Sequence, residues 1–193
     1  MNTLTIVRHG ETIENTLDIL QGQQPGTLSE KGFAQARRLA ERLKDERFHH
    51  IYTSDLSRAL ITAEIVARYH PSTPFTVTPF LRERYFGSHE GISNWRARKD
   101  EIKKRNPFDG ETKTAVTARA KQFLDELERD HTDAHLLLVG HYFINLRLCS
   151  AAMNAPIEEL QKAPHAGNTS VTTLRVGRDR YEILTYNCTR HLD

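Results

Sequence analysis

The stretch LTIVRHGE, residues 4–11, sets two polar side chains directly after a short apolar run. The run Leu4–Val7 does not alternate polar and apolar residues, which is typical of a strand buried on both faces of a sheet. In open α/β sheets, ligands bind outside the carboxyl ends of the strands. We therefore expect Arg8 and His9 to lie at the ligand-binding edge of a central strand.

Five further runs typical of strands follow, separated in most cases by segments of helical spacing. The six runs are Leu4–Val7, Ile51–Thr53, Phe75–Val77, Leu136–Val139, Val171–Val176 and Tyr181–Tyr186. Their alternation with helical segments predicts an α/β fold, a three-layer α/β/α sandwich with a mostly parallel central sheet. Residues 177–180 separate the last two runs like a hairpin turn, so we expect one antiparallel edge strand.

The helical segments show apolar stripes with candidate caps. The stripe that begins at Phe33 follows Ser29, and the stripe that begins at Leu56 follows Ser54 and Asp55. Serine and aspartate accept hydrogen bonds from the first free N–H groups of a helix, so we expect these three residues to be N-caps. Two more stripes begin at Val116 and Ile144.

Length and composition favour one globular domain over residues 1–193. Hydrophobic residues make up 38% and charged residues 27% of the chain, which excludes disordered and membrane classes. The net charge of +2 gives no argument for nucleic acid, and the N-terminus resembles no signal peptide. Two cysteines fit a reducing compartment, so we expect a cytoplasmic protein. Residues 80–110 fit neither pattern and are expected to form an insertion or flap over the site.

Three predicted strands end on polar side chains. Arg8 and His9 follow the first strand, Arg58 follows the second, and His141 follows the fourth. Arginine's planar fork matches phosphate oxygens, and a histidine held among arginines should have a lowered pKa and be a neutral nucleophile. Each residue taken alone has an ordinary alternative as a cap or an ion-pair partner. Their coincidence at three strand ends indicates a phosphoryl site.

These motifs resemble those of the histidine phosphatase superfamily, in its phosphoglycerate-mutase-like branch. The matching segments are Arg8–Thr12 with Asn15, Leu28–Gly32 with Gln35 and Ala36, Ser54–Ala59 with Thr62 and Ala63, Leu81–Glu83 with Gly87, Glu90 and Gly91, Gly110–Thr112 with Arg119, Val139–His141, Asn168–Ser170 and Asn187–Leu192. They follow the family's order over essentially the whole chain.

The resemblance implies a mechanism and a set of residues. It implies that His9 takes the phosphoryl group as a phosphohistidine and that Glu83 protonates the leaving oxygen, then activates water. The resemblance also implies that Arg8, Arg58 and His141 are catalytic residues. Contacts with substrate or phosphate are implied for Arg8, Asn15, Gln21, Gly22, Arg58, His141 and Tyr142. No metal and no other cofactor is implied, because the arginines supply the positive charge.

Several of these assignments have alternatives. Glu83 stands between Arg82 and Arg84, and Glu11 and Glu90 are other candidate acids. Tyr142 occupies a position where the family often has glycine, so its ring either narrows the pocket or stacks on the substrate. His165 either reaches the pocket rim or lies in a surface turn.

The segment after Leu81 is rich in basic residues, namely Arg82, Arg84, Arg96, Arg98, Lys99, Lys103, Lys104 and Arg105. They form either a solvated helix face or a basic flap that steers a polyanionic substrate.

The function expected from this resemblance is metal-independent hydrolysis of a small phosphomonoester. The short separation of Glu83 and His141 favours the compact phosphatases over the mutase alternative, and a non-catalytic phosphate-binding module is a third possibility. Residues 19–23 resemble fructose-2,6-bisphosphatase-like members, whereas residues 187–192 resemble α-ribazole-phosphate phosphatases. The expected partner is a small phosphorylated metabolite, with no nucleic acid and no membrane, for a monomer or homodimer.

Overall fold

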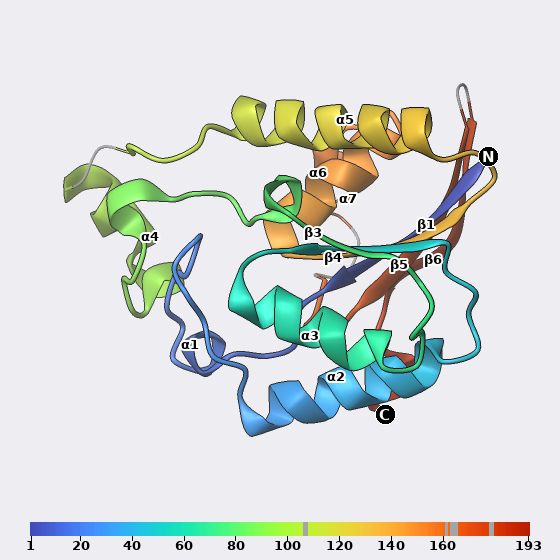
Figure 1. Ribbon diagram of the computed structural model, residues 1–193. Helices are drawn as coiled ribbons and strands as arrows, with labels where there is room; N and C mark the ends of the chain where they lie inside the picture. The colour runs from blue at the N-terminus through green and yellow to red at the C-terminus, as the bar shows by residue number, and fades with distance from the viewer. Residues whose placement is uncertain (106–107, 161, 163–165, 178–179) are drawn as a thin grey trace.

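The computed structural model of the chain has a six-stranded sheet with helices on both faces (Figure 1). It describes residues 1–105, 108–160, 162, 166–177 and 180–193. The strands are β1 (Asn2–Arg8), β2 (His50–Ser54), β3 (Phe75–Thr78), β4 (His135–Gly140), β5 (Val171–Gly177) and β6 (Arg180–Cys188). Their order across the sheet is β3-β2-β4-β1-β5-β6.

Four strands pair in parallel, as predicted, and two pairings are antiparallel. β4 lies between β1 and β2 and runs parallel to both, and β3 runs parallel to β2. β5 runs antiparallel to β1, and β6 runs antiparallel to β5 up to the pair Gly177–Arg180. The strand that reverses direction is therefore β5, one place in from the edge strand β6. Residues 178 and 179 of the predicted turn lie outside the described residues.

Helices cover the two faces of the sheet (Figure 1). The α-helices are α1 (Ile13–Thr16), α2 (Glu30–Leu43), α3 (Ser57–Ala67), α4 (Trp95–Arg105), α5 (Lys113–Asp130), α6 (Tyr142–Ala152) and α7 (Ile157–Leu160). Short 3₁₀ helices are η1 (Pro79–Leu81), η2 (Gly87–His89) and η3 (Arg190–Leu192). In the described part of the chain, no helix has the length and apolar character needed to cross a membrane.

The apolar run of β4 divides between the two faces. Leu136 and Leu138 pack into the cluster formed with α5 and α6, whereas Leu137 and Val139 pack into the cluster formed with α2 and α3. All four side chains are fully buried. Each buried side chain of this size contributes roughly 1.5–3 kcal/mol. This double burial explains why the run does not alternate.

The start of α3 differs from the prediction. Its N-cap is Leu56, which makes no capping hydrogen bond through its side chain. The hydroxyl of Ser54 instead accepts at 3.2 Å from the N–H of Leu56, the N-cap residue itself, and not from an N–H of the first helical turn. The carboxylate of Asp55 pairs with Arg82 on the loop beyond β3. The capping role predicted for Ser54 and Asp55 is therefore wrong, because both side chains bond elsewhere.

Of the predicted flap, residues 80–105 form an irregular excursion that holds η2 and α4 and lies at one end of the molecule (Figure 1). Backbone hydrogen bonds join it to the loop after α1, with Leu20 and Ile92 and with Gly91 and Leu20 as partners. Of the basic side chains predicted there, Arg82 pairs with Asp55 and Arg98 with Glu101. The side chains of Arg96, Lys99, Lys103, Lys104 and Arg105 lie outside the described part of the structure.

The turn after β1 is seated tightly on the start of α2. The predicted cap Ser29 is confirmed, since its hydroxyl accepts from the Gly32 N–H at 3.0 Å. The backbone N–H of Ser29 donates to the carbonyl of Glu11 at 2.9 Å. A Cβ added to Gly32 would lie 1.9 Å from that same carbonyl oxygen. Gly32 therefore permits the close approach that fixes the turn bearing His9.

We expect the substitution Gly32→Ala to lower the free energy of unfolding by about 1–3 kcal/mol, because the added methyl group overpacks this contact. Denaturation in urea measures the effect. Gly167→Ala is the matched control, since its Cβ would meet nothing closer than Thr189 Cγ2 at 3.5 Å. Equal unfolding midpoints for the two variants would contradict the close-packing argument.

Candidate active site

The ends of β1 and β4 bring two imidazole rings together. Arg8 and Gly140 are register partners, and the His9 N–H donates to the Gly140 carbonyl at 3.0 Å. His9 and His141 are the next residues of the two strands, and their ring centroids lie 5.1 Å apart. The parallel pairing therefore places both predicted histidines in one volume.

The ring of His9 is buried and held in one tautomer. Its Nδ1 donates to the carbonyl of Gly10 at 2.7 Å, which leaves the Nε2 lone pair free. Burial, followed by the charges of Arg58 and Arg8, lowers the pKa of His9 well below its usual value. The direction is as predicted, although burial is a larger cause than the arginines. His9 is thus a neutral base with its lone pair available near pH 7.

Arg58 is an almost fully enclosed cation, 1% exposed. Its Nη2 donates to the carbonyl of Gly22 at 2.7 Å and its Nη1 to that of Gln24 at 2.9 Å. Burial lowers its pKa to about 10, so the group stays charged near neutral pH. Its Nε has no hydrogen-bond partner among the described residues. The Gly22 carbonyl thus contributes to the site by accepting from Arg58 and orienting its guanidinium.

Gly22 and Glu90 form one structural unit beside Arg58. Gly22 has φ +55°, and a Cβ there would meet the Glu90 carboxylate at 1.9 Å. The Glu90 Oε1 accepts from the N–H groups of Gln23 at 2.8 Å and Phe86 at 2.9 Å. The alternative of Glu90 as the proton donor is weakened, because this carboxylate is engaged in holding two loops.

Arg8 and Tyr142 lie against each other. Arg8 Nη1 donates to the carbonyl of Ala166 at 2.7 Å. Its Cζ lies 5.9 Å from the centroid of the Tyr142 ring, within the range of a cation–π contact. Tyr142 is partly buried, and burial raises the pKa of its phenol. Tyr142 therefore contacts Arg8, a predicted phosphate ligand.

His141 is fully buried, and neither of its ring nitrogens has a hydrogen-bond partner among the described residues. Burial and then the charge of Arg58 lower the pKa of this imidazole well below its usual value. Buried polar atoms are normally hydrogen-bonded, so such a ring is typical of a binding site. The position suits a contact between His141 and a ligand oxygen.

Glu83 is the buried carboxyl of the site, 9% exposed. Its Oε1 accepts from the Arg84 N–H at 2.7 Å and from the Phe143 N–H at 3.2 Å. Burial raises the pKa of Glu83, and these two N–H groups and the nearby arginines oppose the shift without cancelling it. A raised pKa is what a proton donor working near neutral pH requires.

Glu11, the other alternative acid, is engaged away from the histidines. Its carboxylate accepts from the Ser29 hydroxyl at 3.1 Å and from the Lys31 ammonium at 3.0 Å. Its backbone carbonyl also accepts from the Ser29 N–H. These contacts fix the beginning of α2, which favours Glu83 for proton transfer.

Asn15 and Gln21 lie in the turn beside His9, with polar atoms bonded within the protein. Asn15 Oδ1 accepts from the Thr12 N–H at 3.2 Å and from Asn168 Nδ2 at 3.3 Å. Gln21 Nε2 donates to the Thr12 hydroxyl at 2.9 Å, and its buried Oε1 has no partner among the described residues. Direct contact of Asn15 and Gln21 with phosphate stays a prediction. His165 lies outside the described residues.

Three residues support the site without having been assigned a role from the sequence. The Thr62 hydroxyl accepts from the Gly10 N–H at 3.1 Å and donates to the Arg58 carbonyl at 2.7 Å, so it joins two motifs. Asn168 Nδ2 donates to the His9 carbonyl at 3.1 Å. Both residues lie in segments that resemble the family, and this resemblance is the feature of the sequence that could have identified them.

The third support is Arg119, which holds the loop bearing Glu83. Its Nη1 donates to the carbonyls of Phe80 at 2.7 Å and Arg82 at 2.8 Å. Its Nε and Nη2 bind the Glu111 carboxylate at 3.0 and 2.9 Å. These contacts hold the loop that carries Glu83, whose carboxyl lies within the electrostatic influence of Arg58 and Arg8.

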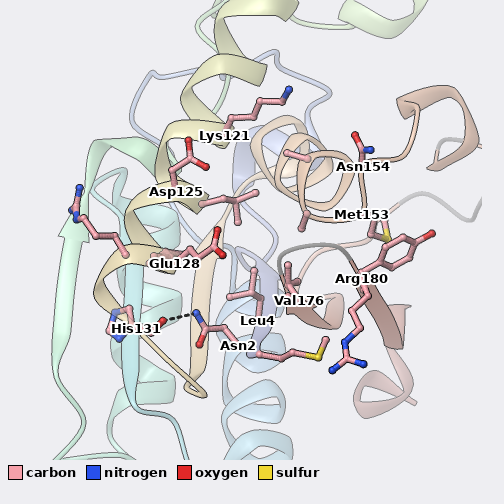
Figure 2. Close-up of a pocket in the computed structure, with 18 of the residues that line it drawn as sticks. Asn2, Leu4, Lys121, Asp125, Glu128, His131, Met153, Asn154, Val176 and Arg180 are labelled. Atoms are coloured by element: carbon pink, nitrogen blue, oxygen red, sulfur yellow. Dashed lines mark hydrogen bonds between the residues drawn. The ribbon is translucent and has the colours of Figure 1, made fainter.

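A hollow of about 1410 Å³ lies elsewhere, between α5, the start of β1 and the β5–β6 hairpin (Figure 2). Asn2, Asp125, Glu128 and Met153 are among its lining residues. It opens at the amino end of β1, whereas His9 follows the carboxyl end. None of the nine predicted site residues lines it. Among the residues that the structure describes, no group of three or more His, Cys, Asp or Glu side chains is placed to hold a metal ion.

Known proteins are similar to this chain in sequence and in fold. The profile of the histidine phosphatase superfamily (branch 1) matches residues 4–189. The adenosylcobalamin/alpha-ribazole phosphatase of Salmonella typhimurium is 30% identical over 167 residues, covering 81% of this chain and 82% of that protein. Fructose-2,6-bisphosphatase TIGAR B of Danio rerio is 40% identical over 142 residues, covering 68% and 55%. The structure of Bacillus stearothermophilus YhfR superimposes with a TM-score of 0.89 at 31% identity, covering 100% of both chains.

We expect Arg58→Gln to weaken the binding of vanadate, a phosphate-like oxyanion, by about 10- to 100-fold, since charge-assisted hydrogen bonds contribute roughly 1.5–3 kcal/mol. Arg58→Lys keeps the charge but loses the planar guanidinium, so its affinity for vanadate should lie between those of the wild-type protein and Arg58→Gln. Titration calorimetry measures the affinities, and circular dichroism checks the fold. Arg129→Gln, at an exposed arginine paired with Asp130, is the control. Unchanged affinity in Arg58→Gln would remove Arg58 from the oxyanion site.

Proposed function

This chain belongs to the histidine phosphatase superfamily (branch 1), and from that premise we propose that it hydrolyses small phosphomonoesters through a phosphohistidine on His9, without a metal ion. The general class of the enzyme is phosphoric monoester hydrolase, in agreement with its phosphatase relatives. The observation that carries the finer proposal is the buried grouping of a neutral His9 with Arg58 and a Glu83 of raised pKa.

In the first step, His9 Nε2 attacks the phosphorus atom. The Nε2–P bond forms as the bond from phosphorus to the leaving oxygen breaks, and Glu83 gives its proton to that oxygen. The cations Arg8 and Arg58 stabilise the charge on the transferring oxygens, which is the main requirement of phosphoryl transfer. His141 contributes a polar ring beside the same group.

In the second step, water replaces the alcohol. Glu83, now a carboxylate, takes a proton from the water as its oxygen attacks phosphorus and the Nε2–P bond breaks. The products are inorganic phosphate, neutral His9 and protonated Glu83, so the enzyme returns to its starting state. One buried carboxyl therefore serves as acid and then as base.

The metal-free part of the proposal rests on charge. Two guanidinium groups neutralise the phosphoryl oxygens where other phosphatases use divalent ions. The proposed substrate is a small phosphorylated metabolite. The relatives' names, a fructose bisphosphatase and an alpha-ribazole phosphatase, refer to different leaving groups and set no single substrate for this chain.

The test of the proposed function is turnover of p-nitrophenyl phosphate in the presence of EDTA. We expect hydrolysis that needs no added bisphosphate, with inorganic phosphate released. His9→Ala should lower kcat by at least about 10³-fold and abolish an acid-labile phosphoenzyme, because the nucleophile is lost.

Three results would contradict the proposal. Stimulation by bisphosphoglycerate with isomerised product would indicate a mutase. Activity that is lost in EDTA and restored by a divalent ion would overturn the metal-free mechanism. Oxyanion binding without turnover would indicate a phosphate-binding module.

For Glu83→Gln we expect a leaving-group dependence. Hydrolysis of an alkyl phosphate should fall by about 10²- to 10⁴-fold, whereas p-nitrophenyl phosphate, whose leaving group needs little protonation, should lose far less. Burial raises the pKa of Glu83, so the wild-type acid stays protonated above the usual carboxyl range, and alkyl phosphate turnover should fall as the pH rises through that raised pKa.

The pH profile of kcat/KM provides the check on Glu83. Its alkaline limb for alkyl phosphates should be absent in Glu83→Gln, which has no proton to lose. Equal losses on both substrates, or an unchanged alkaline limb, would show that another group donates the proton.

A further inference from the structure

The segment after β6 lies against α2. Arg42 of α2 donates through Nη1 to the carbonyl of Cys188 at 3.1 Å, and Arg38 donates to the carbonyl of Leu192. His191, which stands between Cys188 and Leu192 in the sequence, is partly buried. This segment is therefore held to α2 on either side of one imidazole ring.

Both ring nitrogens of His191 are hydrogen-bonded. Nδ1 lies 2.9 Å from Arg42 Nη1, and Nε2 lies 3.1 Å from the hydroxyl oxygen of Thr169. A guanidinium has only donors, so Nδ1 is the acceptor and the ring hydrogen is on Nε2. The ring therefore donates to Thr169, whose hydroxyl donates in turn to the carbonyl of Asn168 at 2.8 Å. The three hydrogen bonds run in one direction, from α2 toward the turn that contains Thr169.

The protonation state of His191 suits these contacts. Burial, followed by the charges of Arg42 and Arg38, lowers its pKa to about 4, and Asp193 opposes the shift. The ring is therefore neutral near pH 7. A neutral imidazole has one acceptor nitrogen and one donor nitrogen, which is what the contacts with Arg42 and Thr169 require.

Thr169 has a backbone conformation that needs support. Its φ is +55°, in the left-handed region that β-branched residues rarely adopt, and the residue is fully buried. Conformations of this kind persist only where the surrounding structure holds them. The hydrogen bonds of its hydroxyl group with His191 and with the Asn168 carbonyl provide such support.

The turn at Thr169 in turn holds the backbone of His9. The Thr169 N–H donates to the carbonyls of Arg8 at 3.0 Å and His9 at 3.3 Å. Asn168 Nδ2 donates to the same His9 carbonyl at 3.1 Å. A change in the orientation of this peptide would move the His9 ring and its Nε2, because both belong to one residue.

We propose that His191 is a positioning residue of the active site, which acts through Thr169 to fix the peptide of His9 and hence the direction of its Nε2. The proposal rests on the proposed function, because it takes His9 as the nucleophile. α2 then supports the turn after β1 at two places. Gly32 packs on the Glu11 carbonyl at the start of the helix, and Arg42 anchors His191 near its end.

Kinetics of p-nitrophenyl phosphate hydrolysis tests the role of His191. We expect His191→Ala to lower kcat by about tenfold and to change KM by less than about twofold. KM should hold because Arg58, which the carbonyls of Gly22 and Gln24 orient separately, still binds the phosphoryl group. His191→Gln should recover part of the loss in kcat, because a side-chain amide has one acceptor and one donor.

Arg38→Gln is the matched control. It removes a contact of the same segment, that with the Leu192 carbonyl, and keeps both hydrogen bonds of the His191 ring, so kcat should stay unchanged. Thr169→Val removes the hydroxyl group and should lower kcat as His191→Ala does. The double variant should lose no more than either single variant, because the two residues act through one contact. An unchanged kcat in His191→Ala, an equal loss in Arg38→Gln or additive losses in the double variant would overturn the proposal.

Hydrogen exchange separates this proposal from the catalytic one. In His191→Ala the Thr169 N–H should exchange at least about fivefold faster than in the wild-type protein, whereas the N–H groups of α5 should keep their rates. Failure of the catalytic proposal would appear as absent p-nitrophenyl phosphate turnover in the wild-type protein, with this exchange difference intact. An unchanged rate at Thr169, or an equal increase at Thr169 and in α5, would overturn the positioning role whatever the turnover.

Discussion

The parallel pairing of β1 with β4 is the constraint on which the site depends. It sets Arg8 opposite Gly140, so the residues that follow, His9 and His141, leave the sheet side by side. A slip of one residue would turn Val7 and Val139 toward the wrong helices, because both faces of these strands are buried. The packing of the core holds this register, and the register in turn sets the distance between the two imidazole rings.

A second constraint is the cost of enclosing cations. Arg58 is almost fully buried, and the carbonyls of Gly22 and Gln24 compensate it where a carboxylate would be the usual partner. Carbonyl dipoles orient the guanidinium without neutralising it, so its full charge stays available for an anion. This explains why the turn needs glycine at position 22, and why Glu90 is placed to hold that turn. The conformation of the loop at Gly22–Gln24 therefore serves to orient the Arg58 guanidinium.

The sequence predicted the layers, the strands and the histidine–arginine grouping because these follow from local patterns. Leu136–Val139 is apolar throughout since it packs on two faces, and the resemblance covered the polar ends of the strands. The roles of Thr62 and Arg119 were not predictable in this way, since both act through backbone groups distant in the chain. The caps assigned to α3 failed for the same reason: Asp55 is bonded to Arg82, a residue 27 positions away. Long-range side-chain contacts leave no periodic signal.

Burial shifts the pKa values of His9 and Glu83 in opposite directions, and both shifts favour the protonation states that the proposed hydrolysis requires. It disfavours the charged form of each group, so the pKa of His9 is lowered and the pKa of Glu83 is raised. A bound phosphate dianion would raise both pKa values and protonate the nucleophile, unless positive charge offset it. Arg8 and Arg58 supply that offset, which gives them a function in the free energy of the nucleophile as well as in binding. Burial therefore favours the reactive form of both groups, whereas the guanidinium groups favour the neutral imidazole and oppose the protonated form of the carboxyl.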